Sequence, residues 1–168
     1  MAATIVFFDV PDELSKLIDN YLNELTKIVE DEIGDVKIHF IFVDSKTMAQ
    51  MNQQYRGKEG PTDVLTFVYE DSYENDDLDE LGVEETQELR KIEESELAEE
   101  PYSEGYICLD VVKKNAEELN NTFEKELLTV FVHSILHMAG YDHEYDTTNA
   151  QEMFAKQTMY VEKLTQGL

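Results

Sequence analysis

The sequence predicts one domain that combines helices with short strands. Its 168 residues match a single domain with a sizeable core. Apolar residues make up 42% of the chain and aromatic residues 10%, which is enough to bury a core. Short β-branched and aromatic runs occur between longer segments with apolar residues at helical spacing. We therefore expect a domain spanning 1–168 that is interrupted by one insertion.

The N-terminal part of the chain begins with an expected strand, helix and strand. The run TIVFF at 4–8 favours a strand, and VKIHFIFV at 36–43 favours another. Between them, residues 12–32 carry apolar residues at helical spacing, and Gly34 provides a stop. His39 alternates with apolar residues in the second strand, so we expect a half-buried strand residue there rather than a metal ligand.

A short helix, a turn and a third strand are expected next. Residues 45–55 favour a helix capped by Ser45. The segment RGKEGPTD at 56–63 contains two glycines and a proline, which indicates a turn. The run VLTFVY at 64–69 favours a strand.

An acidic stretch at about 70–104 interrupts this pattern. It holds 16 Asp or Glu against only Arg90 and Lys91, a net of −14 in a chain whose net charge is −25. We expect a solvated, disordered insertion, although a partner-binding arm is the alternative. The overall charge argues against broad nucleic-acid binding, because clustered Lys and Arg normally supply affinity for phosphate.

The C-terminal part is expected to contain a strand at 105–112 and helices at 113–120, 121–140 and about 148–164. The helix at 121–140 has a broad apolar surface, which predicts a central, buried position. Gly140 suits its end, because glycine readily adopts the left-handed conformation that stops a helix.

This central helix carries the residues that predict a metal site. His133 and His137 are four positions apart, so their imidazoles project from one face of the helix. His143 follows Gly140, where the chain can turn back toward the same metal. Three neutral histidines with a free fourth position are typical of a catalytic zinc. We expect one Zn²⁺ per chain, with another divalent metal as the alternative.

The same spacing occurs in metzincin proteases, but an essential residue is absent. Those enzymes carry Glu directly after the first histidine, where it acts as general base. This chain has Ser134 there, and serine does not accept a proton from water near neutral pH without its own base. The sequence therefore predicts a zincin-like scaffold without peptidase chemistry.

Two separate motifs resemble those of the YbeY family of bacterial endoribonucleases. HSILHMAGYDH at 133–143 resembles that family's H-G-x-L-H-L-x-G-Y-D-H, and MNQQYRGKEGPTDVLTF at 51–67 resembles its L-N-x-x-Y-R-G-x-x-x-P-T-D-V-L-S-F. The resemblance implies an α+β, zincin-like fold with a small mixed sheet flanked by helices. It also implies a metal-dependent, single-strand-specific endoribonuclease that acts in 16S rRNA 3′-end maturation and ribosome quality control.

The resemblance assigns roles to particular residues. It places the metal on His133, His137 and His143, and it gives Arg56 the place of a functional arginine. Arg56 can pair with the scissile phosphate, although a structural ion pair is the alternative.

Three more residues are candidates for indirect or substrate contacts. Lys58 can hold phosphate or stay a solvated loop residue. Asp63 can orient a metal-bound histidine or brace the turn after Pro61. Ser134 lies beside the first histidine in the chain.

Alternative functions are a metal-dependent hydrolase of another substrate, or a ribosome-assembly factor with a mainly structural metal. The expected partners are single-stranded rRNA and the ribosome or small-subunit assembly proteins. The single cysteine, Cys108, suits a reducing compartment. The N-terminus lacks the basic region of a signal peptide, and no apolar run reaches the roughly 20 residues of a membrane span, so we expect a cytoplasmic protein.

Overall fold

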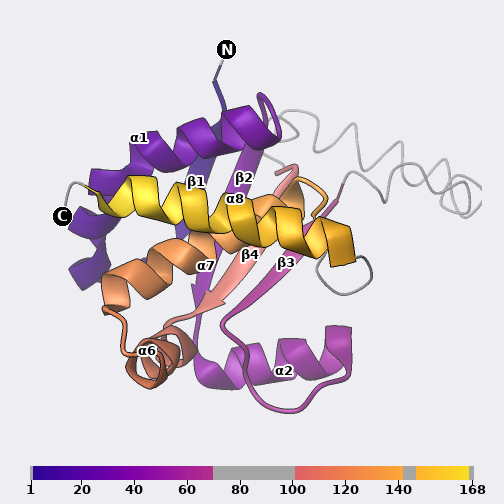
Figure 1. The fold of residues 1–168 in the computed structure, drawn as a ribbon. Coiled ribbons are helices and arrows are strands. Elements are labelled where there is room, and N and C mark those ends of the chain that lie inside the picture. Colours follow the sequence, from indigo (N-terminus) through magenta and orange to yellow (C-terminus); the bar gives the residue numbers. More distant parts are fainter. Residues whose placement is uncertain (1, 70–100, 142–146, 167–168) are drawn as a thin grey trace, which may run out of the picture.

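A four-stranded mixed sheet forms the centre of the computed structural model, which describes residues 2–69, 101–141 and 147–166 (Figure 1). Its strands are β1 (Thr4–Phe8), β2 (Lys37–Val43), β3 (Val64–Val68) and β4 (Ser103–Cys108). They lie in the order β1-β2-β4-β3. The pairs β1–β2 and β2–β4 are parallel, whereas β3 runs antiparallel to β4 and forms one edge of the sheet.

Helices cover both faces of this sheet. On one face α7 (Phe123–Met138) packs against β3, and α1 (Ser15–Glu32), α6 (Leu109–Glu118) and α8 (Thr147–Thr165) pack against α7. A 3₁₀ turn at Asp12–Leu14 precedes α1. Figure 1 shows α1, α7 and α8 in front of the sheet and α2 (Ser45–Arg56) at the lower end. The expected α+β fold, with a mixed sheet and a central His-bearing helix, is confirmed. None of the helices in the described ranges is long and apolar enough to cross a bilayer.

Side-chain alternation in the strands creates the main core. In β2 every second residue is buried, and the Phe40 ring lies 5.0 Å from the Phe131 ring of α7. Gly105 of β4 lies opposite, where an added Cβ would be only 2.7 Å from Ser134 Oγ and 2.8 Å from the Phe40 ring. Glycine at this position therefore allows α7 to approach the sheet closely. This contact brings the histidine-bearing helix close to β4.

The region after the acidic stretch differs from the expectation. The strand predicted at 105–112 begins earlier, at Ser103, and ends at Cys108, after which Leu109 opens α6. The pair Val111–Val112 suggested a strand, but Val112 and Ala116 are both buried, at the four-residue spacing of a helix. Ser103 is fully buried and donates to the carbonyl of Phe67, so it belongs to the sheet rather than to an insertion. Residues 70–100 lie outside the described residues.

The short helix α2 carries the chain from one end of the sheet to the turn before β3. Its cap is Asp44, whose Oδ1 accepts from the Thr47 backbone N–H at 2.7 Å, and not Ser45 as we expected. Its other end is at Arg56, followed by Gly57 in the left-handed conformation, with φ of 65°. Asn52 is buried and donates from Nδ2 to the Gly60 carbonyl at 2.8 Å, which fixes the turn that follows Arg56.

Candidate active site

Two histidines form the polar surface of the otherwise buried C-terminal half of α7. Between Val130 and Met138 every residue of α7 is buried except His133 and His137. Their Nε2 atoms lie 3.1 Å apart, and the rings meet at 72°. Two ligands of a tetrahedral zinc, each about 2.0–2.1 Å from the metal, are separated by about 3.3 Å. The observed separation fits two nitrogens that share one metal ion.

The contact with Gln157 of α8 favours one tautomer of the first histidine. Gln157 Oε1 lies 2.7 Å from His133 Nδ1. An amide oxygen only accepts, so the proton belongs on Nδ1 and the lone pair of Nε2 is directed toward His137. A hydrogen-bonded second nitrogen is the usual arrangement of a metal-binding histidine. Sequence reasoning missed Gln157, because it is one of several polar residues on an amphipathic helix.

A three-residue cluster holds α8, and hence Gln157, against α1. Lys156 Nζ lies 3.0 and 3.1 Å from the two carboxylate oxygens of Glu32. Tyr160 donates its hydroxyl to the same carboxylate. Hydrogen bonding to Tyr141 and to Glu32 raises the pKa of Lys156, which keeps its ammonium charged. Because Lys156 directly precedes Gln157, this cluster helps to set the position of the amide that contacts His133.

The third expected ligand, His143, lies outside the described residues. The described residues before it show where the helix stops: α7 ends at Met138, and Gly140 has φ of 106°. The Tyr141 N–H returns to the Leu136 carbonyl at 3.1 Å, as expected for a glycine-terminated helix. Within the described ranges, no three His, Cys, Asp or Glu side chains gather closely enough to hold a metal.

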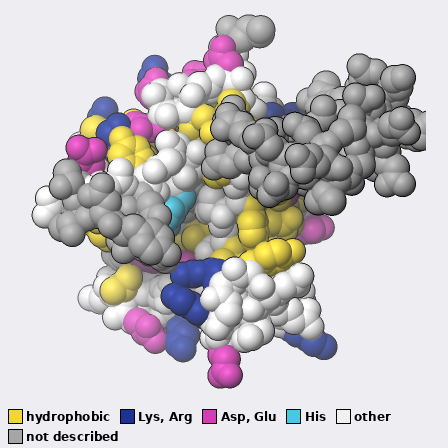
Figure 2. Space-filling view, turned by 90° about the vertical axis from the view of Figure 1, so that its right-hand side faces the viewer, with side chains coloured by type: hydrophobic (Ala, Val, Ile, Leu, Met, Phe, Trp, Pro, Cys, Tyr) yellow, Lys and Arg dark blue, Asp and Glu magenta, His cyan; other side chains and the backbone are white. Residues whose placement is uncertain are grey.

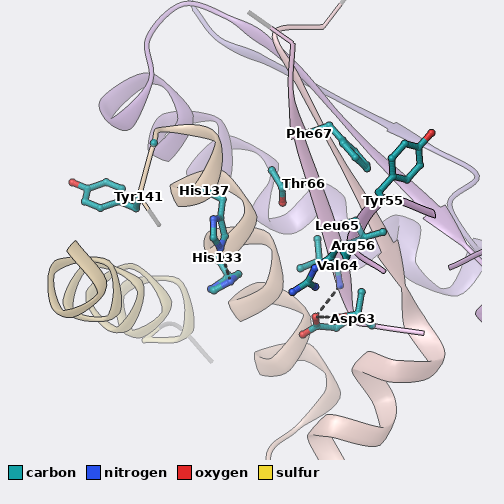
Figure 3. A pocket seen from close by; sticks show the side chains of 12 residues that line it. Tyr55, Arg56, Asp63, Val64, Leu65, Thr66, Phe67, His133, His137 and Tyr141 are labelled. Atoms are coloured by element: carbon teal, nitrogen blue, oxygen red, sulfur yellow. Dashed lines mark hydrogen bonds between the residues drawn. The ribbon is translucent and has the colours of Figure 1, made fainter. Parts of the chain in front are cut away.

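The two histidines line a groove between α7 and the edge strand β3. The cavity measures about 600 Å³, which is within the usual range for ligand sites. Figure 3 shows the histidines on one side and residues from α2, the turn and β3 on the other. The lining residues are Tyr55, Arg56, Thr62, Asp63, Val64, Leu65, Thr66, Phe67, His133, His137, Gly140 and Tyr141.

Arg56 enters this groove from the last turn of α2. Its guanidinium extends toward the histidine pair in Figure 3, although the two segments are about 80 positions apart in the chain. The helix end favours a cation at this position because the last carbonyls carry partial negative charge. The structure therefore brings Arg56 and the two histidines to one cavity.

Asp63 and Lys58, the other two candidates in the loop, differ in their position relative to the groove. Asp63 lines the groove, but its Oδ1 accepts from the Val64 backbone N–H at 2.8 Å and from the Thr62 hydroxyl at 3.3 Å. This contact matches the expected alternative of bracing the turn, and the acceptor beside His133 is Gln157 instead. Lys58 is exposed and is not among the residues that line the cavity.

Ser134 faces the sheet and not the groove. It has no exposed surface, and its hydroxyl lies 2.8 Å from Thr66 Oγ1. In this conformation Ser134 is therefore out of reach of a substrate in the groove. Thr66 does line the groove, so Ser134 can act on the site by orienting the Thr66 hydroxyl.

Local charge at the groove differs from the charge of the whole chain. Figure 2 shows Lys and Arg side chains next to the histidine surface, with most of the visible acidic side chains nearer the edges of this face. His39, the fourth histidine, lies 3.2 Å from Glu104 on the opposite face of the sheet and is half-buried, as expected. The net charge of −25 therefore does not exclude an anionic ligand at this groove.

Comparisons with known proteins agree with the motifs. A sequence profile of the family Endoribonuclease YbeY matches residues 6–165. The chain is 43% identical to Endoribonuclease YbeY of Thermotoga maritima over 150 residues, which covers 89% of this chain and 82% of that protein. It is 30% identical to Endoribonuclease YbeY of Bacillus cytotoxicus over 162 residues, covering 94% and 93%.

A solved structure shares the fold. The solution structure of a Thermotoga maritima protein matches with a TM-score of 0.61 and 41% identity, covering 95% of this chain and 88% of that one. With a profile match over most of the length and relatives above 40% identity, the chain belongs to the Endoribonuclease YbeY family of metal-dependent hydrolases.

Proposed function

We propose that this protein is a zinc-dependent, single-strand-specific endoribonuclease that acts in 16S rRNA 3′-end maturation and in ribosome quality control. The observation that carries the proposal is the groove between α7 and β3. It places two imidazole nitrogens 3.1 Å apart and an arginine in the same cavity. The substrate of the protein is single-stranded rRNA, which it binds in the cytoplasm on the ribosome or together with small-subunit assembly proteins.

We assign the metal to His133, His137 and His143. The first two present nitrogens at a separation that suits zinc, and the third follows Gly140, where α7 has ended, by three positions in the sequence. When bound, the metal supplies a Lewis acid that polarises a phosphoryl oxygen. The contribution of the chain is to hold His133 in the correct tautomer through Gln157 and to keep both rings on a rigid, buried helix.

Arg56 supplies the second positive charge. A guanidinium offers two parallel N–H donors that match the oxygens of a phosphate, and these donors stabilise the charge that grows as the phosphodiester is attacked. Its position at a helix end beside a short, braced turn limits the freedom of its backbone. Arg56 would therefore contact a phosphate from one side of the groove, and the metal that the histidines would hold lies on the other side.

Cleavage of a single-stranded RNA that contains the 16S 3′ region tests the proposal. The assay uses protein purified without a His tag, with and without chelator, beside His137→Ala and His133→Ala variants. We expect one zinc per chain in the parent, loss of cleavage on chelation, and loss of both metal and cleavage in the variants. A 2′,3′-cyclic phosphate at the new end would identify the RNA 2′-hydroxyl as nucleophile, and a 5′-phosphate would identify water.

The same assay separates the alternatives. A parent protein that binds the metal but does not cleave single-stranded RNA would contradict a catalytic metal and favour an assembly factor with a structural one. Cleavage of a non-RNA phosphodiester in preference to RNA would favour a hydrolase of another substrate. Cleavage that survives in His137→Ala would show that the activity comes from a contaminating nuclease.

A further inference from the structure

Tyr55 is an aromatic side chain that the fold leaves exposed at the groove. It lies in the last turn of α2, and 58% of its surface is accessible to solvent, whereas the neighbouring apolar residues Met48 and Leu65 are buried. It lines the same cavity as His133 and His137. A large exposed ring inside a polar groove contributes little to a core, so its position calls for a ligand with an apolar face.

Other aromatic rings pack against the Tyr55 side chain and hold it in place. The Tyr55 ring meets the Phe67 ring edge-to-face, with centroids 5.1 Å apart and planes at 72°. Phe67 meets Tyr106 in the same manner, at 5.7 Å and 81°. Such contacts fix the orientation of aromatic rings. Tyr55 is therefore a supported, outward-facing ring whose ordering does not have to be supplied by the ligand.

The position of this ring relative to the charged groups defines the ligand. Tyr55 directly precedes Arg56, and Figure 3 shows the histidine pair on one side of Arg56 and the Tyr55 ring on the other. A ligand that places a phosphate between the histidines and Arg56 would extend its next group toward Tyr55. In RNA that group is a nucleotide with a flat base.

We propose that Tyr55 is a stacking platform for an unpaired base of the RNA, next to the phosphate that is cleaved. The inference rests on the proposed function and adds a reason for its strand preference. A base within a duplex has both faces covered by its neighbours, so it cannot stack on a protein ring unless it is unstacked. An unpaired base offers a free face, and stacking accepts all four bases.

A single tryptophan at this position gives a direct test. The chain has no Trp, so Tyr55→Trp carries a single tryptophan, which keeps a stacking surface. The matched control is Phe8→Trp, which replaces another exposed ring, 40% accessible, on the opposite edge strand β1. Both variants are titrated with an unlabelled single-stranded RNA that is uncleavable through phosphorothioate and 2′-methoxy substitution, and with its duplex.

The expected result for the Tyr55→Trp variant is strong quenching of its tryptophan fluorescence by the single strand and weak quenching by the duplex. The Phe8→Trp variant should show no quenching by either RNA. Tyr55→Ser should also weaken binding of a labelled single strand by about 5-fold to 150-fold, the range for loss of one base-stacking contact. Metal content should not change.

Three outcomes distinguish the failures. Binding of the single strand that leaves the emission of Tyr55→Trp unchanged would overturn the stacking proposal while the proposed function stands. Equal affinity of Tyr55→Ser and the parent for the single strand would do the same. If the parent neither binds nor cleaves single-stranded RNA, the proposed function itself fails.

Discussion

Gln157 provides the sharpest prediction about the metal site. Gln157→Leu removes the oxygen that lies 2.7 Å from His133 Nδ1 and keeps a side chain of similar size on α8. Without that acceptor, the contact that favours a proton on Nδ1 is lost. A proton on Nε2 would then compete with the metal for the nitrogen that faces His137.

The size of the effect exceeds that of an ordinary hydrogen bond, because the partner lies behind a metal ligand. Loss of a neutral hydrogen bond costs about 0.5–1.5 kcal/mol. Loss of a hydrogen-bond partner behind a metal ligand typically costs about 10-fold to 100-fold in metal affinity, or about 1.4–2.7 kcal/mol. We therefore expect zinc to bind about 10-fold to 100-fold more weakly to Gln157→Leu than to the parent.

Two measurements check this prediction. Competition with a chromogenic chelator gives the zinc affinity, and long-range ¹H–¹⁵N spectra of the metal-free protein report the tautomer of His133. Gln157→Glu keeps an acceptor and should stay close to the parent. Gln151→Leu changes an exposed glutamine of the same helix and serves as the matched control. Parent-like zinc affinity in Gln157→Leu, with an unchanged tautomer, would refute the reasoning.

Other predictions concern the fold around the site. Gly105→Ala places a methyl group 2.7 Å from Ser134 Oγ, so the free energy of unfolding should fall by about 1–3 kcal/mol in urea titrations; parent-like stability would show that α7 shifts freely. Replacing 70–100 with a short Gly-Ser linker should preserve the thermal transition, because the Tyr69 N–H already donates to the Tyr102 carbonyl at 3.1 Å and the ends meet in a hairpin. Loss of that transition would show that the segment stabilises the fold. Burial of its side chain, and next its hydrogen bond to Glu104, raise the pKa of Tyr69. The neutral Tyr69 hydroxyl therefore stabilises the fold fully below about pH 10, and this contribution is lost as the pH rises further. Tyr69→Phe should flatten the alkaline decline of the unfolding free energy, and an unchanged slope would contradict the assignment.

The sequence predicted most of the helices and strands because local pattern determines them. The alternation in β2 and the four-residue spacing of His133 and His137 are both properties of neighbouring positions, and both are present in the structure. Gly140 similarly marks the end of α7. The strand predicted through 112 failed because Val111 and Val112 favour a strand locally, whereas burial of Val112 and Ala116 favours a helix in the folded chain.

Contacts between distant segments were the parts that the sequence did not reveal. Gln157 contacts His133 across two helices, and Thr66 contacts Ser134 between a strand and a helix. Neither pair has a local pattern. Arg56 was found only because its motif resembled a known family, and the structure then placed it in the cavity with the histidines.

The rate of RNA cleavage by Arg56→Lys tests most directly whether the arginine and the histidine pair act on one phosphate. Lysine keeps the charge but lacks the two parallel donors of a guanidinium. We predict that kcat/KM on single-stranded RNA falls about tenfold to a thousandfold, the typical loss for a transition-state charge partner. Zinc content and thermal stability should match those of the parent. Parent-like cleavage by Arg56→Lys at subsaturating RNA would contradict the account.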